Sequence, residues 1–291
     1  MDVSSLASVL APRVWRLAHG RTLELGPQGR IMGILNTTPD SFSDGGAYLD
    51  AGVALRQAIS MVDAGADIVD VGGESTRPGA EPVSGEQERA RVIPVIKALA
   101  EHSQVLISVD TYRAETAEAA AVAGAHIVND VWGCQREPDI AEVAARHGAG
   151  LVIMNNRRGR AVLPNLVEDA LAFWERSLEI ARDAGVTSDA VLLDPGYGFA
   201  DGPVNDLPLL NGVDRLHAAG HALLVGTSRK RFLGAITGRD AANRDVATSA
   251  TSVVARCKGA AVFRVHDVAT NRDALAVADA LLRDQLETAG A

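Results

Sequence analysis

Eight short apolar runs alternate with longer helical patterns between Arg30 and Asp267. Each run closes on a polar or charged residue, and the runs read IMGILN, DIVDVGGE, VLISVD, HIVND, LVIMN, VLLD, LLVGTS and VFRVHD. Continuous apolar runs are typical of parallel strands that are buried on both faces, whereas half-exposed strands alternate. The pattern therefore predicts eight parallel strands.

Between these runs, apolar residues recur three and four positions apart, as on one face of a helix. The clearest segments are residues 52–66, 86–102, 114–125 and 168–186. Several end in Ala-Gly, and glycine just past a helix C-terminus accepts a positive φ angle. The repeated strand–helix unit predicts a single α/β domain, a (β/α)8 TIM barrel. We expect this domain to span residues 1–291, with the barrel at about 30–287, a hairpin at about 14–25 and a frayed tail after Glu287.

The polar ends of the eight runs are the first candidates for a functional site. In such barrels the active site lies at the carboxyl ends of the strands and in the loops after them. The residues in this position are Asn36, Glu74, Asp110, Asn129, Asn155, Asp194, Ser228, Arg264 and His266. Their shared place in the repeat, more than any single residue, predicts a site on this rim.

Two of the loops after strands differ from plain connectors. Residues 36–50 are rich in Gly, Ser, Asp and Pro, which favour turns, so this loop is a candidate lid. In the loop after the second strand, Ser84 with a glutamate and a glutamine behind it predicts an N-cap for the next helix. That role does not explain Arg77, which stands between a threonine and a proline.

A third loop combines cations with a predicted helix start. Ser228, Arg229 and Lys230 would open a helix, and a helix N-terminus with added cations is a natural anion site. Arg264 and His266 close the last strand beside it, in the region where barrels often bind phosphate.

Composition limits the class of protein. The chain has 291 residues, 47% of them hydrophobic, which is enough for a large core. Its formal charge of −9 argues against general nucleic-acid binding, which needs a basic surface. Cys134 and Cys257 are far apart and lack metal-binding spacing, so we expect two reduced thiols. No secretory signal or membrane-length apolar run is evident, so a cytoplasmic protein without membrane association is expected.

Six ordered blocks carry a family resemblance. They are MGILNTTPDSFSDGG, DVGGESTRPGA, ISVDTYR with the following AGAHIVNDV, LDPGYGF, VGTSRKRFLG and RVHDV. Across about residues 30–270 the chain resembles the dihydropteroate synthase family. The resemblance implies a Mg²⁺-assisted transferase that joins 6-hydroxymethyl-7,8-dihydropterin pyrophosphate to p-aminobenzoate, with sulfonamide-like compounds as mimics of p-aminobenzoate.

The resemblance also implies roles for individual residues. Asp110, Asn129, Asp194 and Lys230 would bind the pterin edge, Arg264 and His266 the pyrophosphate, Asn36 the Mg²⁺ ion, and Thr76, Arg77, Pro78, Phe199 and Ser228 the p-aminobenzoate. Buried carboxylates and an amide suit a flat heterocycle with alternating donors and acceptors. Asp110, Asp194, Lys230, Arg264 and His266 are the expected catalytic set. Met154 is a further candidate substrate contact, with barrel packing as its alternative role.

Other polar residues receive a plainer interpretation. The basic run at residues 157–160 is typical of a solvated loop, and anion recruitment is the alternative. The remaining histidines fall in helices, near element ends or in the N-terminal extension, and we expect them to be incidental.

The chain departs from the family at two loops. The usual GFGK is Gly198-Phe199-Ala200-Asp201 here, which replaces a cation by an anion. Roughly 6 Å from a substrate charge, that reversal would cost on the order of 1–5 kcal/mol. The usual Met-His-Met is Met154-Asn155-Asn156, which removes a ring able to carry a proton.

These departures shape the functional prediction. We expect an intact pterin and pyrophosphate site with altered p-aminobenzoate-side loops, and hence a diverged paralogue with weak or lost synthase activity. The alternative is a fully active dihydropteroate synthase in folate biosynthesis. The pterin-binding barrel of methyltetrahydrofolate methyltransferases is a third class, disfavoured because it needs neither the TPDSFSDGG segment nor the SRK segment.

The resemblance further suggests a homodimer. Its contacts could come from Phe232, Leu233 and Ile236, or from the helix face at Val253 and Val254. The same side chains could equally belong to the core.

Overall fold

Eight parallel strands close into a barrel, as the apolar runs predicted. The computed structural model of the chain describes residues 3–37, 47–75, 81–201 and 206–290. The barrel strands are β3 (Arg30–Asn36), β4 (Ile68–Gly72), β5 (Leu106–Asp110), β6 (Ile127–Asp130), β7 (Gly150–Met154), β8 (Val191–Asp194), β9 (Ala222–Val225) and β10 (Val262–Val265). They pair in sequence order, and β10 closes the ring against β3. The (β/α)8 prediction is confirmed.

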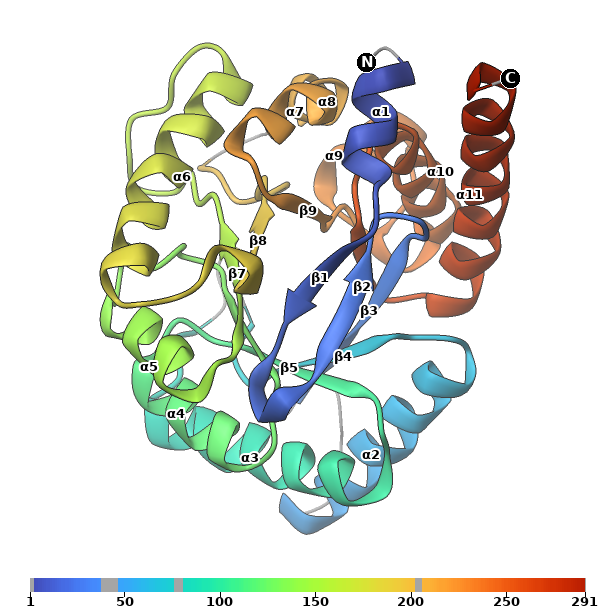
Figure 1. The fold of residues 1–291 in the computed structure, drawn as a ribbon. Coiled ribbons are helices and arrows are strands. Elements are labelled where there is room, and N and C mark those ends of the chain that lie inside the picture. The colour runs from blue at the N-terminus through green and yellow to red at the C-terminus, as the bar shows by residue number, and fades with distance from the viewer. Residues whose placement is uncertain (1–2, 38–46, 76–80, 202–205, 291) are drawn as a thin grey trace.

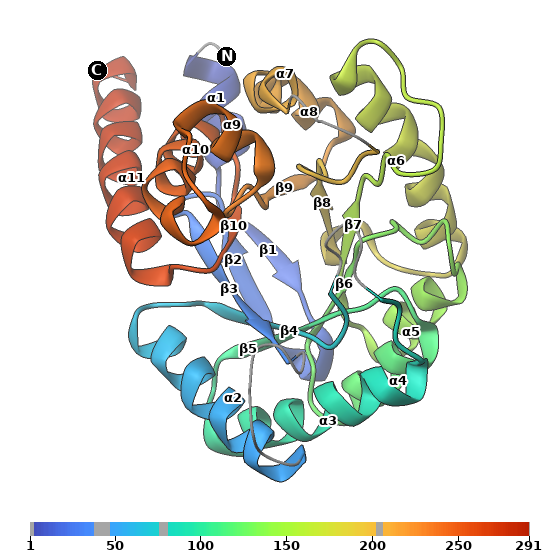
Figure 2. The ribbon, with the colours of Figure 1, turned by 180° about the vertical axis from the view of Figure 1, so that it is seen from behind.

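Helices surround the strands on the outside of the ring (Figures 1 and 2). They are α1 (Val3–Leu10), α2 (Ala47–Asp63), α3 (Gly85–His102), α4 (Ala114–Val122), α5 (Asp139–His147), α6 (Leu166–Asp183), α7 (Leu207–Asn211), α8 (Val213–Leu216), α9 (Arg231–Thr237), α10 (Asp245–Cys257) and α11 (Val268–Gly290). The predicted N-cap is confirmed, because Ser84 and Gln87 form a reciprocal capping box at the start of α3.

An antiparallel hairpin lies across one mouth of the barrel. It consists of β1 (Arg13–Arg16) and β2 (Thr22–Leu25) and runs in front of the barrel strands in Figure 1. Trp15 and Leu25 are buried against apolar side chains near the amino ends of the barrel strands, including Ile68 and Leu106. The Trp15 indole also donates to the carbonyl of Ala190 at 2.8 Å. The hairpin therefore fills the amino-terminal mouth.

Inside the barrel, the side chains change from apolar to polar along the strands. On β4, Ile68 belongs to the apolar layer above the hairpin, whereas Asp70, two residues on, is a fully buried carboxylate. The intervening Val69 packs in the larger core shared with the helices. Because strand side chains alternate between faces, Asp70 points into the barrel, as Ile68 does. It belongs to the polar layer on the side away from the hairpin.

Element ends differ from the expected ones in several places. The second apolar run leaves the sheet at Gly72, so Glu74 lies in the following loop. The segment Ser228–Lys230 leads directly into α9, whose N-cap is Lys230 and whose first residue is Arg231, so the helix begins one residue after the segment expected to open it. The last helix continues to Gly290, past the expected fraying at Glu287. Helix α1 was not predicted.

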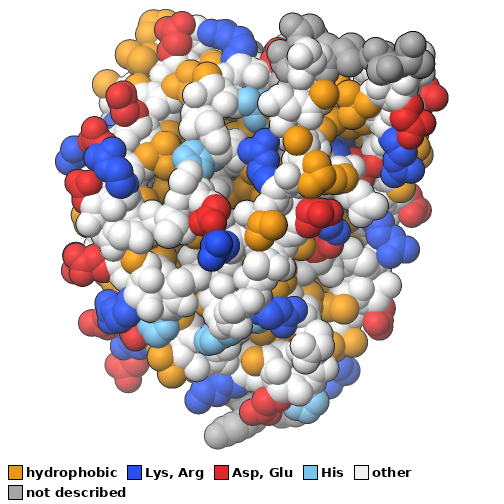
Figure 3. Space-filling view, viewed as in Figure 1, with side chains coloured by type: hydrophobic (Ala, Val, Ile, Leu, Met, Phe, Trp, Pro, Cys, Tyr) orange, Lys and Arg blue, Asp and Glu red, His pale blue; other side chains and the backbone are white. Residues whose placement is uncertain are grey.

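The surface carries charges of both signs. On the hairpin face, acidic and basic side chains are interspersed around the edge of the molecule (Figure 3). Both cysteines are free thiols, with Cys134 buried and Cys257 exposed. Within the described ranges, no helix combines the length and the apolar character that crossing a membrane requires.

Candidate active site

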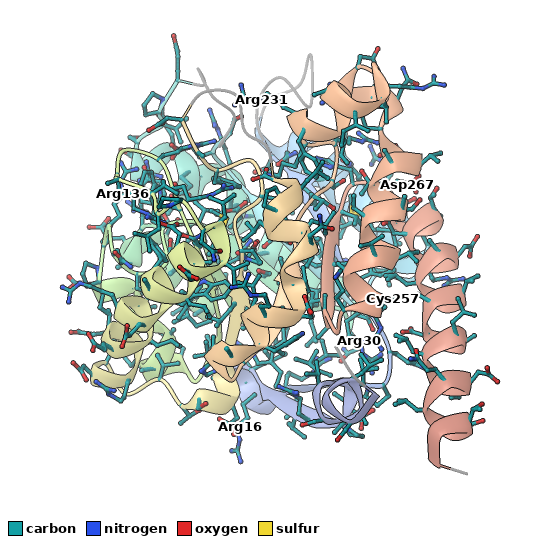
Figure 4. The ribbon with its side chains drawn as sticks, turned by 90° about the horizontal axis from the view of Figure 1, so that it is seen from above. Arg16, Arg30, Arg136, Arg231, Cys257 and Asp267 are labelled. Atoms are coloured by element: carbon teal, nitrogen blue, oxygen red, sulfur yellow. The ribbon has the colours of Figure 1, made fainter. Side chains whose placement is uncertain are left out.

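The carboxyl ends of the strands surround one pocket. It is lined by Asn129, Val131, Met154, Asp194, Tyr197, Phe199, Gly226, Lys230 and Arg264. In the side view of Figure 4, Arg16 and Arg30 lie at the hairpin end, whereas Arg136, Arg231 and Asp267 lie toward the opposite end. The pocket thus opens away from the hairpin.

Arg264 on β10 bonds to carboxylates of β4 and β5 at the pocket floor. Its Nε donates to Oδ2 of Asp70 at 2.6 Å, and its Nη2 donates to Oδ2 of Asp110 at 2.7 Å. Asn129 donates from Nδ2 to the same Asp70 oxygen at 3.0 Å. Burial raises the pKa of Asp110 to about 7, against the opposing effect of Arg264. Burial alone would lower the pKa of Arg264, but the carboxylates of Asp70 and Asp110 raise it.

Asp194 and Lys230 form the second polar side of the pocket. Oδ1 of Asp194 accepts a hydrogen bond from the backbone of Gly196 at 2.7 Å, and burial raises the pKa of this carboxyl to about 6. Burial lowers the pKa of Lys230 to about 8. Its ammonium lies 4.2 Å from the centroid of the Phe199 ring, within cation–π range. The site therefore places a cation, an aromatic face and a carboxyl around one space.

Glycine is required beneath Lys230. Gly198 has a φ of +76°, which strains residues with a side chain, and a Cβ there would lie 2.8 Å from Cδ of Lys230. This close approach explains the second glycine of the PGYGF segment.

The cationic segment after β9 is held by α10. Arg229 adopts a φ of 56°, and its guanidinium makes two 2.7 Å hydrogen bonds to Asp245. Arg244 donates to the carbonyl oxygens of Arg229 and Lys230 at 3.0 and 3.3 Å. These contacts fix the backbone from which Lys230 reaches the pocket.

Ser228 and His266 pair at the ends of the last two strands. Oγ of Ser228 lies 2.9 Å from Nδ1 of His266 and accepts from the His266 backbone at 3.1 Å. His266 follows Arg264 by two residues in the chain, but neither Ser228 nor His266 lines the pocket described above.

Asn36 ends β3 next to Gly72. A Cβ at Gly72 would lie 3.9 Å from Oδ1 of Asn36 and 3.7 Å from Oδ2 of Asp110, so the two side chains flank the same bare backbone. Mg²⁺ prefers oxygen ligands and commonly retains water and substrate phosphates. The amide oxygen of Asn36 fits such partial coordination. Among the described residues, no group of three His, Cys, Asp or Glu side chains could hold a metal.

The basic run at residues 157–160 was interpreted as a solvated loop, and for Arg157 that interpretation was wrong. This arginine is only 3% exposed, and it donates to Oδ1 of Asp206 at 2.6 Å and to the carbonyl of Gly196 at 3.0 Å. Oδ2 of Asp206 in turn accepts from the backbone of Gly198 at 2.7 Å. A buried ion pair thus supports the segment that carries Phe199.

The polar residues that depart from the family pattern are hydrogen-bonded within the protein. Oδ2 of Asp201 accepts from the backbone of Gly159 at 2.8 Å. Arg160 donates to Oδ1 of Asn155 at 2.8 Å and makes two hydrogen bonds to Asp169. Nδ2 of Asn156 donates to the carbonyl of Val131 at 2.8 Å. Asp201, Asn155 and Asn156 therefore each have a hydrogen-bond partner within the protein.

Several predicted site residues lie elsewhere or outside the described residues. Glu74 binds Arg113 at 2.6 Å in a contact between loops. Thr76, Arg77, Pro78 and most of the candidate lid, residues 38–46, are outside the described residues. Met154 both lines the pocket and packs with Val131 and Phe199.

Asp70 is the residue that sequence reasoning missed. It connects Asn129 with Arg264, yet it lies within a strand and not at its end. A charged residue inside the apolar run IVDVG was the available signal, because an isolated carboxylate is costly to bury unless it is paired.

Known proteins are similar to this chain in sequence and in fold. Residues 32–266 match the family model described as pterin binding enzyme. A dihydropteroate synthase of Clostridium beijerinckii is 44% identical over 264 residues, covering 90% of this chain and 98% of the relative.

Two solved structures agree with that match. A Clostridium difficile dihydropteroate synthase in the presence of pteroic acid superposes with a TM-score of 0.85 at 41% identity, over 88% of this chain and 98% of its own. The Xanthomonas albilineans dihydropteroate synthase with 4-aminobenzoic acid gives a TM-score of 0.86 at 38% identity, over 92% and 98%.

Proposed function

Since this chain belongs to the dihydropteroate synthase family of pterin-binding enzymes, we propose that it is an active synthase. It would join 6-hydroxymethyl-7,8-dihydropterin pyrophosphate to p-aminobenzoate and release pyrophosphate. The observation that carries the proposal is the shared pocket of Asn129, Asp194, Lys230 and Arg264, with Asp110 tied to Arg264. Relatives with the same fold and about 45% identity bear this name.

The pocket suits the flat edge of a pterin. Asp110 and Asp194 each have one oxygen engaged by the protein, through Arg264 and Gly196 respectively, and Lys230 supplies a cation. A ligand with ring N–H and amino donors on one edge and acceptors on the other would satisfy these groups together. Phe199 and Met154 supply the apolar surface of the pocket.

The reaction breaks the bond between the pterin methylene carbon and the pyrophosphate oxygen. Negative charge then develops on the leaving group, and fixed cations stabilise such charge best where water is excluded. Arg264 is held in place by Asp70 and the backbone of Lys230 by Arg244, and His266 follows Arg264 by two residues in the chain. Cations in fixed positions need little reorganisation as the bond breaks.

The arylamine of p-aminobenzoate forms the new carbon–nitrogen bond and loses a proton to solvent or to the leaving group. It is neutral at pH 7, so no strong general base is needed. Phe199 and Ser228 are our described candidates for this side, together with Thr76 and Arg77. Sulfonamide-like mimics would bind the same place.

A bound Mg²⁺ ion would neutralise charge on the departing pyrophosphate. Asn36 would contribute its amide oxygen, and substrate phosphates and water would complete the coordination.

Retained activity is the alternative that the sequence departures disfavoured. The expectation of weak or lost activity assumed that Asp201 lies near a substrate charge and that Asn155 removes a ring able to carry a proton. Asp201 instead accepts from the backbone of Gly159, and Asn155 accepts from Arg160. Both changed residues thus have partners within the protein, which supports a functional set of loops.

The test is an assay of the purified protein with Mg²⁺ and both substrates. We expect pyrophosphate release and dihydropteroate formation only when both substrates are present. No turnover at high enzyme concentration would contradict the proposal. Binding of pteroic acid without turnover would then favour a non-catalytic pterin-binding paralogue.

A further inference from the structure

The side-chain amide of Asn129 has two possible orientations with opposite consequences for a ligand. An amide presents either an acceptor oxygen or two N–H donors on a given side. Asn129 is 2% exposed and lines the pocket, so whichever end faces the pocket meets the ligand without competing water.

Asp70 decides between these orientations. Its Oδ2 lies 2.6 Å from Arg264 Nε in an ion pair and 3.0 Å from the Asn129 amide. A carboxylate paired with a guanidinium accepts hydrogen bonds and donates none, so the NH2 group of Asn129 must face it. The amide oxygen then points away from Asp70. Among the described residues, no hydrogen bond to that oxygen is present.

We infer that Asp70 is a positioning residue that turns the carbonyl of Asn129 toward the pocket and so sets the pocket's preference for ligands with ring N–H and amino donors. This inference rests on the proposed function, because it concerns the recognition of the pterin. Asp70 itself is fully buried beneath Asn129 and Arg264 and acts through them.

The neighbouring carboxyls are divided in the same way. Oδ2 of Asp110 accepts a hydrogen bond from Arg264, and Oδ1 of Asp194 accepts one from the backbone of Gly196. With the Asn129 oxygen, each of these three residues has one atom held by the protein and one oxygen left for a ligand. A donor-rich edge would therefore bind, whereas an edge bearing a carbonyl at the same place would be rejected.

The test compares two probes that differ at one group: a 2-amino-4-oxo pterin and its 2-oxo analogue, a lumazine. Calorimetric titration gives the ratio of their affinities. We expect the unmodified protein to favour the amino compound at least tenfold, since a lost or reversed buried hydrogen bond costs about that much. In Asp70→Ala the amide of Asn129 is released, and the ratio should fall about tenfold, with most of the loss on the amino compound.

Asp70→Asn is the conservative variant. Its amide oxygen can still accept from Arg264 and Asn129, so we expect it to retain most of the discrimination. If Asp70→Ala fails to fold, this variant combined with Asn129→Ala still tests the inference. The effect of Asp70→Asn on the ratio, however small, should disappear when Asn129 is already absent.

Ser108→Ala is the matched control. Ser108 pairs in register with Asp70 on the neighbouring strand, is fully buried, and its hydroxyl has no hydrogen-bond partner among the described residues. We expect its affinity ratio to equal that of the unmodified protein.

A folded Asp70→Ala protein with the unmodified ratio would overturn the inference, as would equal changes in Ser108→Ala. Additive effects of the Asp70 and Asn129 substitutions on the ratio would overturn it too. If the unmodified protein binds neither probe, the proposed function fails first, so the two failures are distinguishable.

Discussion

Single buried side chains in this barrel combine a hydrogen bond to a neighbour with a shifted pKa. Asp110 is the clearest case, because one oxygen is bonded to Arg264 while burial opposes its ionisation. Its pKa of about 7, against an ordinary 3.8, means that the folded state binds the proton more tightly than the unfolded chain. Its contribution to stability is therefore fully present below about pH 4 and is lost as the pH rises through 7.

Asp110→Asn should consequently stabilise the protein at pH 8. Asparagine resembles the protonated carboxyl and does not titrate, so the gain grows as the pH rises through about 7 and vanishes near pH 4. Urea denaturation at several pH values measures it, and pteroic acid titration should show weaker binding. Identical pH dependence of the unfolding free energy in both proteins would contradict this prediction.

Gly198→Ala should damage the site more than the fold. The positive φ angle costs on the order of 1–2 kcal/mol with a side chain present, and the new methyl group would displace Lys230. We expect a modest fall in the thermal midpoint and a loss of synthase activity of tenfold or more. Gly148→Ala, also at positive φ but with open space around it, is the control that should keep full activity.

At this scale the sequence pointed to most pocket residues but not to all. Position at a strand end identified Asp110, Asn129 and Asp194, because the repeat itself places them on one rim. Asp70 and Arg157 escaped because their importance depends on partners about 50 or more residues away. Spacing along the chain gives no sign of such pairings.

At the scale of elements, the loops after β7 and β8 act as one unit. Arg157 with Asp206, and Gly159 with Asp201, connect them on either side of Phe199. The apolar runs predicted the strands well because burial on both faces is a strong signal. They located the strand ends less well, since apolar or polar character does not mark the last hydrogen bond of a ladder.

Asp201→Lys installs the residue usual in the family and should not raise activity. It removes the acceptor for the Gly159 backbone. It also replaces an anion that raises the pKa of Arg158 by a cation, where the charge of Arg231 already lowers that pKa. We expect a lower thermal midpoint and an unchanged or lower rate of pyrophosphate release. A several-fold increase in the rate would instead support the expectation that Asp201 impairs synthase activity.

At the scale of the whole molecule, the predicted homodimer remains a prediction, but its candidate contacts are fewer. Phe232 and Leu233 are buried within the subunit, whereas Ile236 and Val254 are 58% and 42% exposed on α9 and α10. Exposed apolar side chains on adjacent helices suit a contact with a second copy.

Ile236→Asp combined with Val254→Asp should shift the protein from dimer to monomer mass in light scattering, because buried unpaired carboxylates oppose association. Val246→Asp, at a position 78% exposed, tests how far the contact extends along α10. A monomeric unmodified protein would refute the homodimer.

The β1–β2 hairpin has a kinetic consequence. Because it closes one end of the barrel, the reactants and products of the proposed reaction would all have to pass through the opposite mouth. In the proposed reaction the pterin would occupy the bottom of the pocket, so it would have to arrive before p-aminobenzoate, and the joined product would have to depart before another pterin could enter. Saturating p-aminobenzoate would then slow the exchange of bound pterin.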